Sequence, residues 1–292
     1  MKKFTAAGLK NTWGDKEIIK ARAKRGPGTS SPTPEELKVY EKFFKTAQGS
    51  KKKVKVLVLG ATPEIRDLSI RLGAETIAVD VSPRLLLTLT NVMKYKDDFK
   101  NKFMVGDWLE ADKFLPKNSF DIVMADVSLS NLPAKNNKDM LRVVNHLLKK
   151  DGYFITRNIA YDFPKKLKTV DEILRDFKKR CNTPLGLVFE LCLETELLKK
   201  GFNPKIKEYN WATLGEVEEH VKRHLDVKNR AYFANLTKHA KVHKLSVLSK
   251  KEFNDIVKKY FSIRDIVVVK GVGHSRFVPI YFLKAKKGLL LI

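Results

Sequence analysis

The sequence has 292 residues and a net charge of +25, with 58 basic against 33 acidic residues. Hydrophobic residues make up 43% of the chain, which is ordinary for a globular protein and enough for a full core. No apolar run approaches the roughly 20 residues that a membrane-spanning helix needs. Cys181 and Cys192 are the only cysteines in the sequence, so we expect neither a disulfide framework nor a cysteine-rich zinc site. Together these features predict a cytoplasmic protein without membrane contacts.

The excess positive charge is concentrated in the two flanks of the sequence. Residues 1–53 carry +9 and residues 161–292 carry +13, whereas residues 54–160 carry only +3. Basic flanks of this kind suit a polyanion such as RNA. Lys greatly outnumbers Arg, however, and specific nucleic-acid contacts favour the Arg fork, so a general preference for surface Lys explains the charge equally well. Nucleic acid therefore stays open as a partner.

Residues 1–53 are predicted to form a basic helical extension attached to the core. A short basic helix is expected at 16–24, followed by a connector rich in Gly and Pro. A second helix starts at Thr33-Pro34-Glu35-Glu36, with Thr33 as the N-cap and acids in the first turn. Apolar side chains then recur at helical spacing, at Leu37, Tyr40, Phe43 and Phe44.

Residues 54–160 alternate short apolar strands with helices, which is typical of a parallel sheet covered on both faces. Thr62 is the expected N-cap of the first of these helices, and Gly73 is expected to close it. The predicted strands cover 54–59, 76–81, 102–105, 120–125 and 152–158, and the predicted helices cover 63–72, 83–93 and 138–148.

After residue 160 the pattern changes twice. Residues 161–262 contain only helical candidates and are predicted to form a lid or substrate region; the candidates cover 167–179, 187–200, 214–225, 232–244 and 250–260. Residues 263–292 contain two strands, at 266–269 and 277–283, which form a terminal hairpin with a longer loop.

The first two strands of the 54–160 segment end in residues suited to an adenosine-containing cofactor. Ligands of open parallel sheets bind outside the carboxyl ends of the strands. The first strand runs into Gly60-Ala61-Thr62-Pro63, where Gly60 allows a ligand to approach the backbone. The second strand ends at Asp80, followed by Val81 and Ser82, and a carboxylate there can accept hydrogen bonds from both ribose hydroxyls.

Two further strand ends extend this predicted site. Gly106-Asp107-Trp108 follows the third strand, where the carboxylate can bind an adenine amine and the indole can cover the purine. Asp126, Val127 and Ser128 end the fourth strand, beside the first. Asp126 can face the cofactor or a substrate there, or it can cap the next loop.

On these ordered motifs the chain resembles the class I S-adenosylmethionine-dependent methyltransferases. The resemblance covers residues 54–158 and extends to the terminal hairpin. It implies an α/β fold: a Rossmann-like, mostly parallel seven-stranded sheet of order 3-2-1-4-5-7-6 with helices on both faces, plus the N-terminal extension and the helical insertion. S-adenosyl-L-methionine is the implied cofactor.

The resemblance also implies a role for each part of the site. The turn at 60–63 packs on the methionine portion, Asp80 holds the ribose, and Asp107 and Trp108 hold the adenine. Residues 126–128 form the floor near the methyl group, and Trp13 and Arg25 can fold back over the cofactor.

The glycine motif departs from the family pattern. Val58 stands where the family has an acid, and Thr62 and Glu64 stand where it has two further glycines. A dinucleotide-binding protein or a non-catalytic adenosyl-binding protein therefore stays open. No acceptor signature is visible, because Asp126-Val127-Ser128-Leu129 differs from Asn/Asp-Pro-Pro-Tyr/Phe. No catalytic residue is named; a small-molecule acceptor is favoured, and an RNA or protein acceptor is the alternative.

The histidines do not predict a metal site. His220 and His224 are four residues apart, as are His239 and His243, so each pair can share a helix face. Lysines and acids flank both pairs, which favours solvated helix faces. His274, in the hairpin loop, is expected to be structural or exposed.

Overall fold

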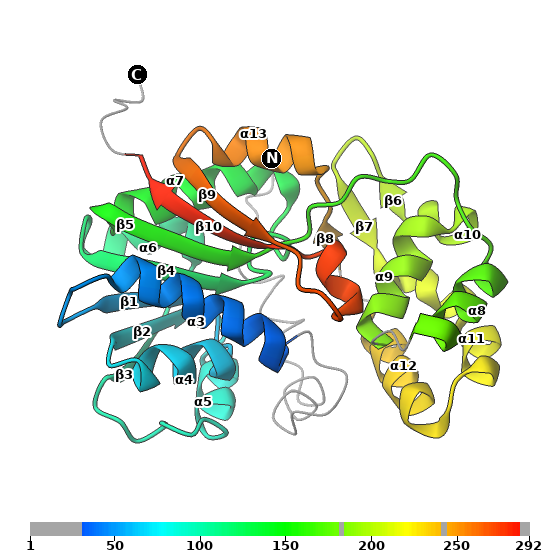
Figure 1. Cartoon of the computed structure of the whole chain (residues 1–292), viewed down its shortest axis with the longest axis horizontal. Coiled ribbons are helices and arrows are strands. Elements are labelled where there is room, and N and C mark those ends of the chain that lie inside the picture. Colours follow the sequence, from blue (N-terminus) through cyan, green and yellow to red (C-terminus); the bar gives the residue numbers. More distant parts are fainter. Residues whose placement is uncertain (1–30, 181–183, 241–243, 287–292) are drawn as a thin grey trace.

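The computed structural model describes residues 31–180, 184–240 and 244–286, and its main feature is a seven-stranded sheet. The strand order is β3-β2-β1-β4-β5-β10-β9, with β1 to β5 parallel and β10 antiparallel to both of its neighbours (Figure 1). This is the predicted order 3-2-1-4-5-7-6, so the fold prediction is confirmed. The strands are β1 Lys55–Leu59, β2 Glu75–Asp80, β3 Asn101–Val105, β4 Phe120–Asp126, β5 Leu148–Arg157, β9 Phe261–Val267 and β10 Ile280–Ala285.

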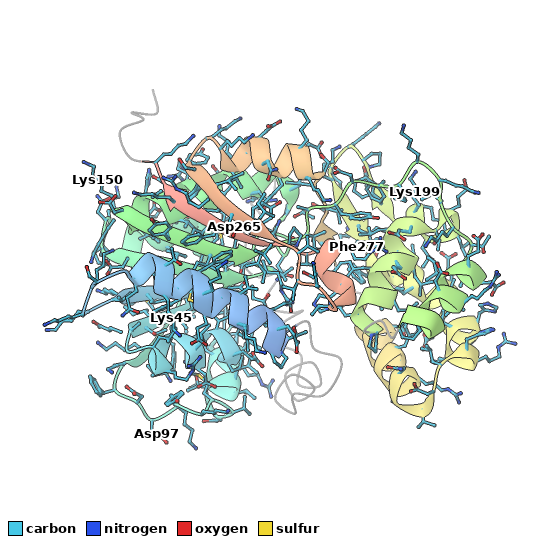
Figure 2. The ribbon with its side chains drawn as sticks, viewed as in Figure 1. Lys45, Asp97, Lys150, Lys199, Asp265 and Phe277 are labelled. Atoms are coloured by element: carbon cyan, nitrogen blue, oxygen red, sulfur yellow. The ribbon has the colours of Figure 1, made fainter. Side chains whose placement is uncertain are left out.

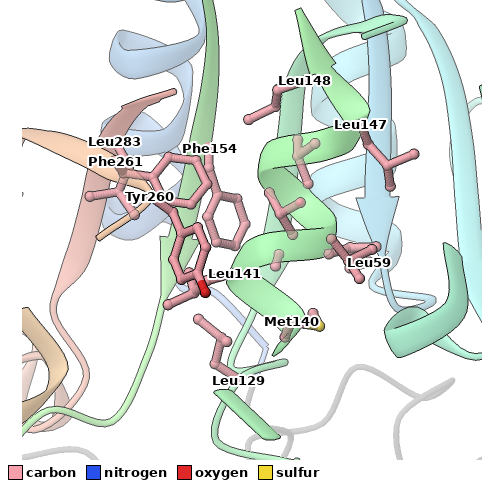
Figure 3. Close-up of a cluster of buried hydrophobic side chains, with 14 of the residues drawn as sticks. Leu59, Leu129, Met140, Leu141, Leu147, Leu148, Phe154, Tyr260, Phe261 and Leu283 are labelled. Atoms are coloured by element: carbon pink, nitrogen blue, oxygen red, sulfur yellow. The ribbon is translucent and has the colours of Figure 1, made fainter. Parts of the chain in front are cut away.

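Helices cover both faces of the sheet because successive side chains of a buried strand point to opposite sides. In β1, Val56 and Val58 join one hydrophobic core with α3 Pro34–Gln48, α4 Pro63–Arg71 and α5 Pro83–Thr90. Leu57 and Leu59 join the opposite core, which is built with α6 Ala111–Phe114, α7 Asn137–Leu147 and α13 Lys250–Val257. Figure 3 shows this second core, where Leu141 of α7 and Phe154 of β5 lie among the labelled side chains.

Helix α3 is part of the core, so its interpretation as an attachment is wrong. Its start is the predicted one: Thr33 and Glu36 form a reciprocal capping box, which is a purely local interaction. Its apolar face covers the central strands, and the Phe43 ring stacks on Phe282 of β10 with 4.7 Å between centroids. Detaching α3 would expose the centre of the sheet. Since burying one Phe contributes roughly 1.5–3 kcal/mol to the free energy of folding, α3 contributes substantially to stability.

Of the two residues predicted to start and end α4, Gly73 behaves as predicted and Thr62 does so only in part. Gly73 closes α4 with φ +87°, as expected of a glycine in the left-handed region. Thr62 precedes α4 as predicted, but its side chain accepts no capping hydrogen bond. The terminal strands are also displaced from their predicted positions, because β9 begins at Phe261 and a 3₁₀ turn, η4 Gly273–Arg276, fills the loop before β10.

The segment between β5 and α13 forms a second unit with its own core, beside the sheet in Figure 1. It is not wholly helical, because a small sheet of order β6-β7-β8 runs through it and α12 ends at Ala240, before β8 begins. Its elements are α8 Val170–Arg180, α9 Pro184–Glu194, α10 Glu196–Lys199, β6 Phe202–Asn203, β7 Glu208–Asn210, η3 Trp211–Glu216, α11 Glu218–His224, α12 Val227–Ala240 and β8 Lys244–Ser246. We call residues 161–248 the helical unit.

The helical unit meets the sheet at the carboxyl ends of β4 and β5. Ile159 belongs to the core of the helical unit, and Val127 packs against it. Phe277 joins the same core from the sheet side and lies between the two parts in Figure 2. Charged side chains such as Lys45 and Lys199 project outward from both parts (Figure 2). Within the described ranges, no helix is both long and apolar enough to cross a bilayer.

Candidate functional site

The five parallel strands bring the predicted site residues to one edge of the sheet. Leu59 pairs with Val79 and with Ala125, so β1, β2 and β4 end level with one another. Asp80 pairs with Val105, which places the end of β3 at the same edge. The predicted turns after these strands are therefore neighbours in space. Trp13 and Arg25 lie outside the described residues.

Gly60 forms an open cradle at the end of β1. Its backbone has φ +109°, a conformation that glycine adopts without a steric cost. A Cβ atom at this position would meet only Trp108 Cζ2 at 3.8 Å and Ser128 Oγ at 3.9 Å. The Ser128 hydroxyl donates to the Leu59 carbonyl at 2.8 Å and so ties the end of β4 to β1. Ala61, Thr62 and Pro63 continue the turn as buried residues.

The Asp80 carboxylate is held in one orientation at the end of β2. Its Oδ1 accepts a hydrogen bond from the Ser82 backbone N–H at 2.9 Å, across Val81. The Ser82 hydroxyl in turn accepts from the Leu85 N–H and caps α5. Because the bond to Oδ1 comes from the backbone of the same turn, it orients the carboxylate at the edge where a ribose is predicted.

The residues after β3 already use some of their polar groups in hydrogen bonds within the protein. The Gly106 N–H donates to the Asp80 carbonyl at 3.0 Å, and the Asp107 carboxylate accepts from the Leu109 N–H and caps a 3₁₀ turn, η1 Trp108–Glu110. The Trp108 indole N–H donates to the Val79 carbonyl at 2.7 Å, which fixes the half-buried ring beside Gly60. That Asp107 and Trp108 contact the adenine stays a prediction. Such contacts would use the second carboxylate oxygen of Asp107 and the face of the Trp108 ring.

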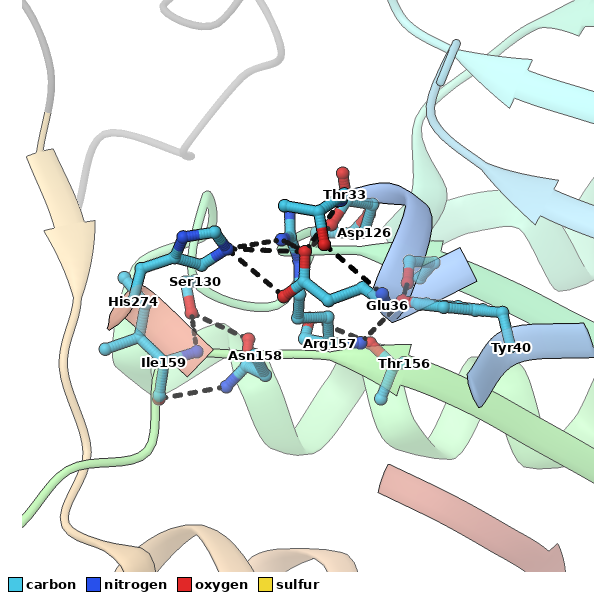
Figure 4. Close-up of polar contacts among 12 residues, drawn as sticks. Thr33, Glu36, Tyr40, Asp126, Ser130, Thr156, Arg157, Asn158, Ile159 and His274 are labelled. Atoms are coloured by element: carbon cyan, nitrogen blue, oxygen red, sulfur yellow. Dashed lines mark hydrogen bonds and ion pairs between the residues drawn. The ribbon is translucent and has the colours of Figure 1, made fainter. Parts of the chain in front are cut away.

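Asp126 is engaged in a buried ion cluster. The Arg157 side chain reaches Asp126 Oδ1 through Nε at 2.8 Å and Glu36 Oε2 through Nη1 at 2.7 Å (Figure 4). His274 Nε2 lies 3.2 and 3.3 Å from the two Glu36 carboxylate oxygens. The side chains of all four residues are almost completely buried. We call Glu36, Asp126, Arg157 and His274 the Arg157 cluster.

The charges of the Arg157 cluster stabilise one another. Burial by itself would raise the pKa of Glu36, but the positive charge of Arg157 and the hydrogen bond from His274 bring this pKa down to about 2. Burial alone would lower the pKa of Arg157, yet Asp126 and Glu36 raise it above its ordinary value. The cluster therefore holds fixed charges, and a buried pair of this kind costs several kcal/mol to break.

The Asp126 carboxylate thus binds Arg157 in the core, and its predicted place beside the cofactor or a substrate stays a prediction. The sequence could not reveal this pairing, because the partner lies on another strand. Glu36, Arg157 and His274 were likewise missed as a group, although Arg157 was visible as the only charged residue in the predicted strand 152–158. His274 is structural, which was one of its two predicted states.

The chain turns sharply where it leaves β4. Val127 has φ +58°, and its N–H donates to the Arg157 carbonyl at 2.9 Å. A β-branched residue is strained in this left-handed conformation, and such strain is concentrated at functional sites in proteins. Ser130 follows in the same loop, and its hydroxyl donates to the Asn158 side-chain oxygen at 2.6 Å. These bonds join the ends of β4 and β5.

Comparison with known protein families identifies the chain. A family described as a methyltransferase domain matches residues 61–216, which is more than half of the sequence. The chain belongs to this family. Together with the sheet order, the match confirms the predicted membership of the class I S-adenosylmethionine-dependent methyltransferases and the cofactor that goes with it. No curated protein sequence matches this methyltransferase-family chain significantly.

Solved structures share the fold at low sequence identity. The CcbJ methyltransferase from Streptomyces caelestis is 14% identical with a TM-score of 0.56, over 94% of this chain and 98% of its own. A Burkholderia thailandensis 1,6-didemethyltoxoflavin-N1-methyltransferase, with bound 1,6-didemethyltoxoflavin and S-adenosylhomocysteine, is 12% identical with a TM-score of 0.53, over 96% and 88%. A Rhodobacter sphaeroides protein provisionally titled a zinc-dependent alcohol dehydrogenase is 16% identical with a TM-score of 0.55, over 92% and 99%. These likenesses concern the fold alone.

The described residues fit the adenosine part of the cofactor better than its amino acid part. The cradle at Gly60 and the oriented carboxylate of Asp80 are the features that a nucleoside at this edge requires. Val58, at the position of the family's acid, is completely buried and offers no side-chain acceptor to an amino group. The amino group must therefore find another partner at the edge.

Proposed function

We propose that this chain transfers a methyl group from S-adenosyl-L-methionine to a small-molecule acceptor bound between the sheet edge and the helical unit. The observation that carries the proposal is the pairing of the Gly60 cradle with the oriented Asp80 carboxylate at level strand ends. A cradle gives close approach to the backbone, and the carboxylate gives two acceptor oxygens for a ribose diol.

Each part of the edge has a proposed binding role. The turn of Gly60, Ala61, Thr62 and Pro63 packs on the methionine portion, and Asp80, with Val81 and Ser82 behind it, accepts from the ribose hydroxyls. Gly106, Asp107 and Trp108 enclose the adenine. Val127 and Ser128 form the floor beside the methyl group, while Asp126 supports that floor through Arg157.

Positioning accounts for the chemistry in this proposal. When bound, the cofactor would supply an electrophilic methyl group, which an acceptor atom attacks in line as S-adenosylhomocysteine leaves. The protein holds the acceptor on that line and excludes water. Asp126 is unsuited to remove a proton from the acceptor, because its carboxylate is buried against Arg157. A general base is needed only where the acceptor atom carries a proton of high pKa.

The helical unit is proposed as the substrate region. It packs at the ends of β4 and β5, which are the strands nearest the predicted methyl group, through Val127 and Ile159. The Burkholderia enzyme with the same fold has 1,6-didemethyltoxoflavin bound, which favours a small-molecule acceptor for this chain as well. RNA is the second candidate, favoured by the basic flanks and by exposed Lys165 and Lys166 before α8.

Titration calorimetry with S-adenosylhomocysteine tests the cofactor site. Asp80→Ala should weaken binding roughly tenfold to a hundredfold, since a lost hydrogen bond to a charged group costs about 1–3 kcal/mol. Asp151→Ala, at a surface acid paired with Lys284 far from the edge, is the control and should bind like the wild type. Absence of heat with the wild type would contradict the proposed function, and unchanged affinity in Asp80→Ala would contradict the ribose contact.

Salt dependence separates the two acceptor classes. An RNA-directed enzyme should bind RNA with an affinity that falls steeply as salt rises, because phosphate contacts release counterions. A small-molecule enzyme should show weak RNA binding and should methylate compounds in a metabolite mixture supplied with labelled cofactor. Tight, salt-sensitive RNA binding without labelling of small compounds would overturn the small-molecule assignment.

A further inference from the structure

A cluster of side chains of the types that bind metals lies on the helical unit, away from the sheet edge. His220 and His224 lie one turn apart on α11, and Asp171 lies in the first turn of α8. One ligand atom from each of the three residues lies within 4.8 Å of the ligand atoms of the other two. The sequence shows only the histidine pair, because Asp171 comes from a helix 49 residues earlier.

The present hydrogen bonds orient both imidazoles for coordination. His220 Nε2 lies 2.6 Å from Asp171 Oδ1 and donates its proton to this carboxylate, so a metal ion that takes the place of this proton meets both ligand atoms. His224 Nδ1 lies 2.9 Å from the His220 carbonyl oxygen. A carbonyl only accepts hydrogen bonds, so Nδ1 carries the proton and Nε2 is left with a free lone pair. A backbone carbonyl on the second ring nitrogen is the usual way in which proteins orient a metal-binding imidazole.

The spacing is close to that of a tetrahedral site. Zinc binds imidazole nitrogen and carboxylate oxygen at about 2.1 Å, which separates neighbouring ligand atoms by roughly 3.4 Å. The Asp171–His220 contact must widen by somewhat less than 1 Å to reach this value, as the zinc ion replaces the proton between them. The side chains of His220 and Asp171 are 41% and 66% exposed, so both can rotate freely enough to do so.

Two cations between His220 and His224 in the sequence are engaged with other groups. Lys222 pairs with Glu218 and Glu219, and the Arg223 Nε donates to the Glu219 carbonyl. Neither group therefore competes with a metal ion for Asp171.

We propose that Asp171, His220 and His224 form a surface site for Zn²⁺ or a similar first-row divalent ion, with water completing the coordination. The ion bridges α8 to α11 and thereby stabilises the helical unit. Two imidazoles and one carboxylate select such an ion over Mg²⁺ or Ca²⁺, which prefer oxygen ligands. The site is independent of the proposed methyl transfer, so either proposal can fail without the other.

Metal titration of the purified full chain tests this site. Zn²⁺ binding is measured by calorimetry, Co²⁺ binding by its visible ligand-field absorption, and stability by the thermal midpoint with Zn²⁺ and with EDTA. We expect one Zn²⁺ per chain, a higher midpoint with Zn²⁺ than with EDTA, and no response to Mg²⁺. His224→Ala and Asp171→Asn should each weaken Zn²⁺ binding at least tenfold and abolish the rise in midpoint.

Two control variants separate this site from other histidines. His146→Ala removes a histidine that lies 2.9 Å from Asp112 but has no second histidine near that carboxylate among the described residues. The double variant His239→Ala/His243→Ala removes the other pair with the same spacing. Both controls should bind Zn²⁺ like the wild type, with circular dichroism confirming that every variant is folded. Absence of Zn²⁺ binding in the wild type, unchanged affinity in His224→Ala, or loss of binding in the double variant would overturn the proposal.

Discussion

The buried ion pair between Glu36 and Arg157 gives a sharp test of what holds α3 on the sheet. Glu36→Gln keeps the shape of the side chain and the capping box with Thr33, because Gln also serves at that position. It removes the negative charge that accepts from Arg157 Nη1 at 2.7 Å and from His274 Nε2. The substitution therefore isolates the charge of Glu36 from its role in starting the helix.

The expected cost follows from the burial of the pair. Breaking a buried ion pair from one side costs about 3–5 kcal/mol, because it leaves a charge without its partner. Arg157 retains Asp126 at 2.8 Å, so the loss should lie near the lower limit, about 3 kcal/mol. Urea unfolding at neutral pH, followed by circular dichroism, measures the change in the free energy of unfolding.

Glu41→Gln is the matched control on the same helix. Hydrogen bonds from Arg71 and Lys45 lower the pKa of Glu41 to about 2, the same value as for Glu36. Glu41 lies at the surface, however, where an ion pair contributes less than about 1 kcal/mol. If Glu36→Gln lost no more stability than Glu41→Gln, burial would not determine the strength of these pairs and the reasoning would be refuted.

The pH dependence supplies a second measurement on the same variant. The folded state lowers the pKa of Glu36 from 4.5 to about 2, so its stabilising effect is complete above about pH 4.5. The effect is lost as the pH falls toward about 2 and the carboxylate becomes protonated in the folded state. The difference between wild type and Glu36→Gln should therefore shrink across this window, and a difference that stays constant would contradict the assignment.

Three further outcomes are expected. Tyr40→Phe should lower the free energy of unfolding, measured in urea, by about 1–3 kcal/mol. The completely buried hydroxyl donates to the Ala125 carbonyl at 2.8 Å and accepts from the Arg157 N–H at 2.9 Å. A loss near zero would mean that water satisfies both groups. Gly201→Ala should cost about 1–3 kcal/mol, since its Cβ would lie 2.9–3.0 Å from three neighbouring atoms, whereas Gly215→Ala, with no atom within 4 Å, should change stability by less than about 0.5 kcal/mol. In a Cys181→Ser background, Cys192 should resist a thiol reagent at about pH 8 until the protein unfolds, because burial raises the pKa of its thiol to about 12; labelling of the native protein at the unfolded rate would argue against that burial.

Local sequence patterns were sufficient for most of the sheet. A strand buried on both faces is a short apolar run, so β1 and β4 were recognisable without any knowledge of their neighbours. The start of α3 was equally visible, because Thr33 and Glu36 bond to each other across three residues. Short elements such as β6 and β8 were missed, since strands of two or three residues carry no periodicity of their own.

The candidate site was only partly accessible in the same way. Gly60 and Asp80 could be named because each follows an apolar strand, and parallel strands bring such ends together. Which parts of the protein these side chains bind was a different question. Asp126 looked like Asp80 in the sequence, yet one carboxylate lies in an ion cluster and the other accepts from its own turn.

By itself, then, the sequence determined where along the chain the apolar runs lie, which turns end them and which polar residues follow. Tertiary structure alone decided which charges meet. Arg157 pairs with Asp126, at a separation of 31 residues in the sequence, and with Glu36, at a separation of 121. His220 pairs with Asp171, at a separation of 49. The physical reason is range: hydrogen bonds of caps and turns join residues near in sequence, whereas ion pairs form between whichever charges the packed strands and helices bring within a few ångströms.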